Sequence, residues 1–249
     1  FFFSTPPPTC AVVGYSATSM SCGRPILAAR RPAYRQANLA TLTERQRGLF
    51  EHWTHDASFI PIEFYPHWRF RFERDKVRLA DRWKKWRRDG FEAKFDEVLD
   101  HVAKHGPIMA RDLGDGEARS NQGWWDWHPS KTALEYLWRT GALAIKQRRS
   151  FQKVFDLTER VIPPDILAVE PAPEETIHWA AASAMDRLGF ATLGEIAALW
   201  ETITAAQAKT WAAAHVGDDL IEIDVEGATG AIRRCFARPS VLDSAETAP

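Results

Sequence analysis

Four cationic residues gather around one short turn of the chain: Lys146, Arg148, Arg149 and Lys153. The segments before and after this turn, 142–146 and 151–157, alternate apolar and polar residues, which predicts a β-hairpin. Ammonium and guanidinium groups at a hairpin tip suit contact with phosphate oxygens better than packing in a core. We therefore expect this hairpin to bind phosphate groups.

A short helix is predicted directly before the hairpin, between Pro129 and Gly141. Proline fits the first turn of a helix, and glycine fits the position that follows its last turn. One apolar face at helical spacing is formed by Ala133, Leu134, Leu137 and Trp138. Ser130 and Lys131 open the helix, where backbone amides and side chains meet phosphate, so we expect both to contact it.

Three tryptophans precede this helix: Trp124, Trp125 and Trp127. Their rings could stack on nucleic-acid bases, or they could pack beneath the helix. Aromatic residues at this spacing more often belong to a core. We count Trp127 among the expected binding residues, and the packing alternative stays open.

A long helix is predicted over residues 67–89, after an aromatic and histidine-rich segment at 50–66. Its buried stripe consists of Phe72, Leu79, Trp83 and Trp86. The other faces carry the basic residues Arg69, Arg71, Arg74, Lys76, Arg78, Arg82, Lys84, Lys85, Arg87 and Arg88. A solvated face usually mixes both signs, so this excess indicates phosphate contact. We assign that contact to Arg69 and Arg71, and a plain solvated face is the alternative.

The formal net charge of −1 hides an asymmetry between the two parts of the chain. Residues 165–249 hold five basic and 14 acidic residues, a net charge of −9. Residues 1–164 hold 27 basic and 19 acidic residues, a net charge of +8. A basic part of this kind points to a polyanionic partner, and solvated faces are again the alternative.

Cysteine and histidine usage argues against a metal or disulfide protein. Cys10, Cys22 and Cys235 show no ligand spacing and no pairing pattern, which favours a reducing compartment. The eight histidines are scattered, so we expect no metal site and no cofactor. No apolar run approaches the length of a membrane span, and the first residues lack the features of a signal peptide.

The order helix, helix, helix, strand, strand is complete from residue 91 to residue 163, with a second helix expected at 108–113. This is the order of a winged helix, a fold that presents one helix to a nucleic-acid groove. A similar order follows, with helices at 174–188, 193–200 and 205–215 and a strand at 220–225. That strand directs Glu222, Asp224 and Glu226 to one face, which would repel phosphate, so the second copy is expected to be structural or a clamp wall.

The expected fold class is mainly α with small β-hairpins (α+β), built from tandem winged-helix domains. Residues 1–30 contain no Asp or Glu and show no helical or alternating pattern. We expect an atypical segment at 1–30, disordered or frame-shifted, and then a remnant of an N-terminal winged-helix or helical domain with a basic helix at 31–90. A winged helix at 91–163, a linker at 164–173, a second winged-helix-like domain at 174–243 and a tail at 244–249 are expected to follow.

Two long motifs, LFEHWTHDASFIPIEFYP at 49–66 and GWWDWHPSKTALEYLWRTGALAIKQRRSFQKVFDLTERVIP at 123–163, strongly resemble the YcaQ/AlkZ crosslink-repair DNA glycosylases. The resemblance covers residues 32–239. It implies tandem winged helices on duplex DNA, usually followed by a C-terminal β-barrel. It also implies cofactor-free hydrolysis of the N-glycosidic bond of alkylated purines, including interstrand crosslinks, by a monomer in the bacterial cytoplasm, associated with the nucleoid.

The chain departs from this family at the catalytic motif, a Gln-x-Gln or Gln-x-Asp sequence that precedes the first of the two motifs. Gln36 is followed by Ala37 and Asn38, and Gln46 by Arg47 and Gly48. We interpret residues 1–30 as a shifted reading frame or a gene fragment, and the chain as truncated at both ends. The alternatives to a glycosylase are a non-catalytic winged-helix DNA-binding protein and an inactive fragment.

The neighbourhood of the lost motif is still present around Trp53. The resemblance implies that Glu51, His55 and Asp56 line the lesion pocket, with His55 or Asp56 touching sugar or phosphate. The alternative is a capped turn in which these side chains satisfy backbone groups and Trp53 is part of the core.

Overall fold

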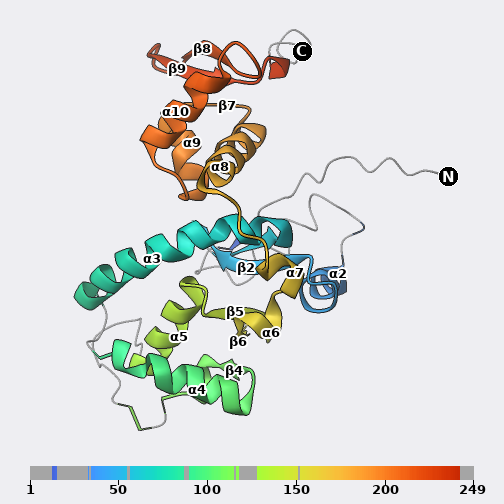
Figure 1. Ribbon diagram of the computed structural model, residues 1–249, viewed down its shortest axis with the longest axis vertical. Coiled ribbons are helices and arrows are strands. Elements are labelled where there is room, and N and C mark those ends of the chain that lie inside the picture. The colour runs from blue at the N-terminus through green and yellow to red at the C-terminus, as the bar shows by residue number, and fades with distance from the viewer. Residues whose placement is uncertain are drawn as a thin grey trace, which may run out of the picture. The chain divides into compact units, whose positions relative to one another are not determined.

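The computed structural model describes residues 13–15, 33, 35–54, 57–86, 90–114, 116–117, 128–150 and 152–241 (Figure 1). The chain divides into two compact units, Phe1–Val169 and Glu170–Pro249, and each is described by itself. Helices and small antiparallel sheets alternate in both units, which confirms the predicted α+β class.

The first sheet of the first unit contains β1 (Val13–Tyr15), β3 (Ala57–Pro61) and β2 (Leu49–Trp53), in that order. Every residue of β3 is buried, and it pairs with β1 and β2 on its two sides. β1 lies within residues 1–30, for which the sequence predicted no strand. A strand of three residues is too short to show alternation, so pairing with β3 decides its structure.

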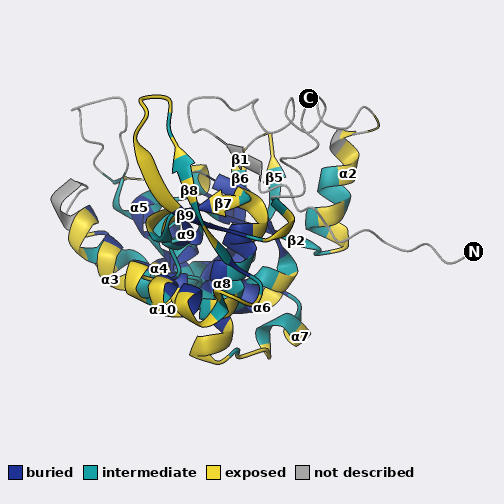
Figure 2. Ribbon diagram, turned by 90° about the horizontal axis from the view of Figure 1, so that it is seen from above, coloured by how far each residue is buried: buried dark blue, intermediate teal, exposed yellow. Residues whose placement is uncertain are grey.

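Helical segments flank this sheet. α2 (Gln36–Ala40) and η1 (Thr41–Arg45) precede β2, while η2 (Ile62–Phe64) and α3 (Tyr65–Trp86) follow β3. Along α3 the buried apolar stripe includes the predicted Phe72, Leu79 and Trp83, together with Trp68. The helix therefore shows a buried and an exposed side (Figure 2).

The second sheet belongs to the segment predicted as a winged helix. In chain order its elements are η3 (Glu92–Lys94), α4 (Phe95–His105), β4 (Ile108–Met109), η4 (Ala110–Asp112), α5 (Pro129–Arg139), β5 (Leu143–Arg149) and β6 (Gln152–Leu157). The strand order is β4-β6-β5. The predicted helix at 108–113 is wrong in its first half, because Ile108 pairs with Phe155 and the sheet satisfies its backbone groups.

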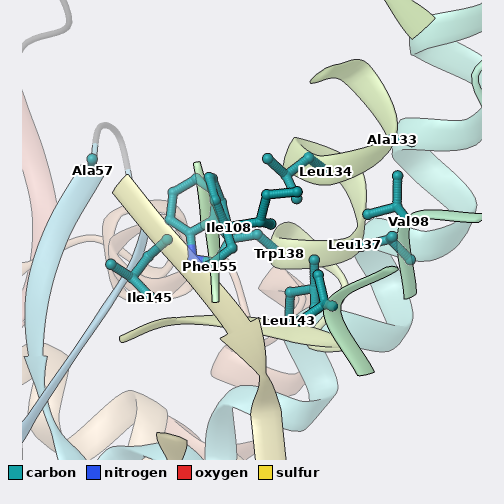
Figure 3. Close-up of a cluster of buried hydrophobic side chains, with 11 residues drawn as sticks. Ala57, Val98, Ile108, Ala133, Leu134, Leu137, Trp138, Leu143, Ile145 and Phe155 are labelled. Atoms are coloured by element: carbon teal, nitrogen blue, oxygen red, sulfur yellow. The ribbon is translucent and has the colours of Figure 1, made fainter. Parts of the chain in front are cut away.

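The core of this segment is formed where α4 and α5 pack on the sheet (Figure 3). All four residues of the predicted apolar face of α5 are buried there, and the predicted hairpin of β5 and β6 is confirmed. Gly141 ends the α5 region with a φ of 84°. A Cβ at this position would lie 2.5 Å from the Phe72 ring of α3, so only glycine fits.

Two short helices, α6 (Thr158–Val161) and α7 (Pro164–Leu167), complete the first unit. The second unit then contains α8 (Pro173–Leu188), β7 (Phe190–Ala191), α9 (Leu193–Trp200), α10 (Ala205–His215), β8 (Ile221–Glu226) and β9 (Ile232–Ala237). Its strand order, β7-β9-β8, repeats the pattern of the second sheet. The three helices lie where the sequence predicted them, while β9 was not predicted.

Candidate nucleic-acid interface

The N-terminus of α5, where phosphate was expected, is occupied by a carboxylate of the same chain. Glu117 accepts hydrogen bonds from the backbone N–H of Ser130, at 3.1 Å, and from its hydroxyl group. The Lys94 ammonium lies 3.4 Å from the same carboxylate. His128 caps the helix by accepting from the backbone N–H of Lys131 at 3.2 Å. Ser130 is therefore buried and bonded internally, whereas Lys131 is partly exposed.

The electrostatics of this end favour the ionised carboxylate. Although burial acts to raise the pKa of the Glu117 carboxyl, hydrogen bonds from Ser130 and Lys94 outweigh it and hold that pKa below its ordinary value. A negative charge at the N-terminus of a helix also interacts favourably with the helix dipole. The site thus has the properties expected of an anion site, with Glu117 as its anion. Trp127 lies outside the described residues.

Three of the four cations of the hairpin lie against carboxylates within the first unit. Lys146 is 2.9 Å from Asp156. Arg148 binds Glu51 through two nitrogens, with 2.8 Å between Nε and Oε2. Asp156 belongs to the second strand of the hairpin itself, whereas Glu51 comes from β2, and the sequence could not show that β2 would lie beside the hairpin. Arg149, at the tip, is exposed and is the hairpin cation best placed to meet a ligand.

Lys153 is the most enclosed of these cations. Its ammonium group donates to both oxygens of Glu135 at 3.0 Å and lies 3.6 Å from the centre of the Trp138 ring. Burial lowers the pKa of Lys153, while the charges of Glu135 and Glu51 act to raise it. This arrangement is that of an internal ion pair, so the interpretation of Lys153 as a phosphate contact is replaced by a structural one.

A chain of buried hydrogen bonds joins α3, β2 and α5. Trp68 donates to Nδ1 of His52 at 2.8 Å, so Nε2 carries the proton and donates to the carbonyl of Trp138 at 3.2 Å. Trp138 donates in turn to the carbonyl of Glu51 at 3.1 Å. Burial and the charge of Arg71 hold the pKa of His52 well below its ordinary value, which keeps the imidazole neutral.

Of the three expected pocket residues, one, Glu51, lies on β2, and the other two follow that strand in the sequence. Glu51 is buried and bound to Arg148, so its carboxylate is not open to a ligand. His55 and Asp56 lie outside the described residues. On either side of them, the hydroxyl groups of Thr54 and Ser58 are hydrogen-bonded at 2.7 Å, which closes the turn between β2 and β3.

The two expected contacts on α3 also have internal partners. Arg69 donates to the carbonyl of Leu167 at the end of α7. Arg71 is 1% exposed and donates to the carbonyl of Thr54 at 3.2 Å. The interpretation of Arg71 as a phosphate contact is therefore replaced by a structural one. Arginines further along the helix lie closer to solvent and were not singled out, although their spacing of four residues was visible in the sequence.

The second unit has a hairpin of mixed charge. Glu222, Asp224 and Glu226 are exposed on β8, as the alternation predicted. However, β9 adds Arg234, 3.7 Å from Glu222, and Arg233, 3.6 Å from Glu195 of α9. The expected acidic face is thus offset by arginines of a strand that was not predicted.

A comparison with protein families matches residues 11–249 to the family described as DNA glycosylase AlkZ-like. The chain belongs to this family. The match includes β1 and both units. Among solved structures, the chain is similar to Streptomyces sahachiroi DNA glycosylase AlkZ, with a TM-score of 0.63 and 15% identity. That similarity covers 95% of this chain and 64% of the other, and it shows a shared fold.

Neither a Gln-x-Gln nor a Gln-x-Asp sequence occurs in the 249 residues of the chain. Among the described residues there is no group of three or more His, Cys, Asp or Glu side chains arranged to hold a metal. Within the same residues, no helix combines the length and apolar character needed to cross a membrane.

Proposed function

We propose that this chain binds duplex DNA and hydrolyses the N-glycosidic bond of alkylated purines, including purines in interstrand crosslinks. Membership of the AlkZ-like family, over residues 11–249, is the observation that supports the proposal. The positive net charge of residues 1–164 supports a polyanionic ligand on the first unit. We further propose that the protein acts as a monomer on DNA in the bacterial cytoplasm.

The proposed reaction breaks the bond between C1′ of the sugar and the purine nitrogen. The bonding electrons leave with the base, and water adds its oxygen to C1′ and releases a proton. A purine alkylated at N7 already carries a positive charge, so protonation of the leaving group contributes less. A carboxylate or amide beside the sugar would stabilise the oxocarbenium-like cation and orient the water. We propose that the turn bearing His55 and Asp56 lines this site.

We propose that α5 is the helix that approaches the DNA groove, in a winged helix formed by α4 to β6. The repetition of this element order in the second unit supports tandem winged helices. Lys131 on α5 and Arg149 at the hairpin tip are exposed enough to reach phosphates, and Lys146 and Arg148 would contribute charge behind them. Such contacts position a duplex without reading its sequence.

The proposal is tested with a duplex that carries one N7-methylguanine. Under single-turnover conditions with the protein in excess, base release produces an abasic site, which hot alkali converts to a strand break. We expect release faster than the spontaneous rate on the methylated duplex and none on an unmodified duplex of the same sequence. Release at the spontaneous rate, at a protein concentration that saturates the duplex, would contradict the catalytic part.

A second candidate function is DNA binding without catalysis. It is favoured by one observation, that the chain contains no Gln-x-Gln or Gln-x-Asp sequence. The same assay separates the two functions, because a non-catalytic protein would bind the methylated and unmodified duplexes equally and release no base from either.

A further inference from the structure

One side of α3 carries a row of arginines. Arg74, Arg78 and Arg82 recur every four residues, so they follow one another along the same side of the helix. The rise of an α-helix makes this row roughly 12 Å long. The side chains of Arg74 and Arg78 are 35% and 42% exposed, and Arg82 is exposed as well.

A single buried carboxylate lies at the base of the row. Asp75 has a side chain only 2% exposed, 3.3 Å from Arg74 and 3.5 Å from Arg78. Arg71 lies 3.8 Å from the same carboxylate and is bonded to Thr54 at the end of β2. Bonds to one carboxylate restrict the orientation of planar guanidinium groups, so Asp75 holds the first two arginines of the row in place.

The basic residues of α3 outnumber its acidic residues. The described side chains of α3 include six basic residues, Arg69, Arg71, Arg74, Lys76, Arg78 and Arg82, against three acidic ones, Glu73, Asp75 and Asp81. Lys76 pairs with Glu73 at 2.6 Å on another side of the helix. Asp75, by contrast, lies within 4 Å of three guanidinium groups, those of Arg71, Arg74 and Arg78.

We infer that Arg74, Arg78 and Arg82 form a track for the phosphates of one DNA strand, and that Asp75 positions the track. This inference rests on the proposed function, because it takes duplex DNA as the ligand. Each strand of a duplex carries one phosphate per 3.4 Å of helix axis, so a row of this length meets about three of them. The guanidinium fork matches two phosphate oxygens at once.

The test measures the salt dependence of binding. A fluorescein-labelled 20-base-pair duplex is titrated with the full chain by fluorescence anisotropy, from about 50 to 300 mM NaCl. Each lost phosphate contact lowers the slope of log K against log [NaCl] by about 0.9, so R74Q/R78Q/R82Q is expected to lower it by about 2–3. At about 150 mM salt the affinity should fall by roughly 10- to 100-fold, equally for unrelated duplex sequences.

A matched control removes the same total charge elsewhere. K76Q/K104Q/K209Q neutralises three exposed lysines, one on another side of α3 and two on α4 and α10. We expect it to leave the slope within about one unit of the parent value. Substitution with lysine, R74K/R78K/R82K, is expected to restore the slope, because an ammonium group still releases a counterion, but to restore the affinity only in part.

Each outcome bears on a different statement. A parent protein that fails to bind the duplex contradicts the proposed function, and the track with it. The track is wrong, and the proposed function stands, if the parent binds and R74Q/R78Q/R82Q has the same slope as the parent. The same holds if R74Q/R78Q/R82Q weakens binding no more than K76Q/K104Q/K209Q does. Should the triple variant lose its circular dichroism signal, the single variants replace it, each with an expected slope change of about 0.9.

Discussion

At the scale of single residues, the positions of carboxylates decide which cations stay available to a ligand. In the hairpin, Lys146, Arg148 and Lys153 each lie against a carboxylate of the same unit. Around Asp75, by contrast, three guanidinium groups lie near a single carboxylate. The two clusters look alike in the sequence as runs of basic residues. They differ in the structure because the hairpin has an acid of its own, Asp156, and two more beside it, Glu51 from β2 and Glu135 from α5.

Asp75→Asn tests how strongly the arginine cluster depends on its carboxylate. The substitution leaves guanidinium groups close together, one of them fully buried, so we expect the free energy of unfolding to fall by about 3–5 kcal/mol. Urea unfolding followed by tryptophan fluorescence measures this loss. Asp81→Asn, at an exposed position of the same helix, is the control and should change stability by no more than about 0.5 kcal/mol. Equal effects of the two substitutions would show that Asp75 has no special role.

Glu117→Gln tests the carboxylate at the N-terminus of α5 through pH. Because the folded-state pKa of Glu117 is lowered, its ionised form stabilises the protein above the ordinary carboxyl pKa. This contribution is lost as the pH falls through the lowered value. We expect Glu117→Gln to cost about 1 kcal/mol at pH 7 and progressively less towards pH 3, as measured by urea unfolding at each pH. A difference that is constant with pH would contradict the assignment.

At the scale of elements, the contact of α5 with α3 depends on Gly141. Alanine there meets both a positive φ and the Phe72 ring, whereas alanine at Gly106, with a φ of 87°, has nothing within 4 Å of the new Cβ. Both variants place alanine at a positive φ, so the difference between them reports chiefly the contact with Phe72. We expect Gly141→Ala to destabilise by about 2 kcal/mol more than Gly106→Ala in urea unfolding. Equal losses of stability in the two variants would contradict a close contact between α5 and α3 at Gly141.

Elements with strong local patterns were predictable from the sequence. α5 has a proline at its first position, a glycine after its end and four apolar residues at helical spacing, and it was predicted within one residue. The strands β1 and β4 have three and two residues, too few for a pattern, and exist because a neighbouring strand pairs with them. β9 alternates less clearly than β8, since its first half is exposed on both faces.

The candidate site was less predictable than the elements that carry it. The sequence identified the basic regions, but the choice between an internal ion pair and an exposed cation depends on contacts between distant residues. Arg148 and Glu51 are 97 positions apart, and no local pattern links them. The row on α3 could have been recognised from its spacing, because Arg74, Arg78 and Arg82 repeat every four residues while the buried stripe lies beside them.

At the scale of the whole molecule, the chain consists of two units with separate sheets, and their charges differ in sign. The sheets β1-β3-β2 and β4-β6-β5 belong to the first unit, and the sheet β7-β9-β8 belongs to the second. Hence we expect two thermal transitions rather than one, since each unit has its own buried residues. Duplex DNA should raise the transition of the first unit, where the basic row lies, because binding to the folded state alone stabilises it.

One core substitution in each unit assigns these transitions in a calorimetric scan. Leu134 of α5 and Ile196 of α9 are almost completely buried, and replacing either with alanine costs about 2–5 kcal/mol. Leu134→Ala should lower only the transition that DNA raises, and Ile196→Ala only the other one. Each kcal/mol corresponds to roughly 4–8 °C for the second unit, Glu170–Pro249, and to roughly 2–4 °C for the longer first unit, Phe1–Val169, so both shifts are readily measured. If both substitutions move a single shared transition, the units unfold together and stability gained by DNA binding in one extends to the other.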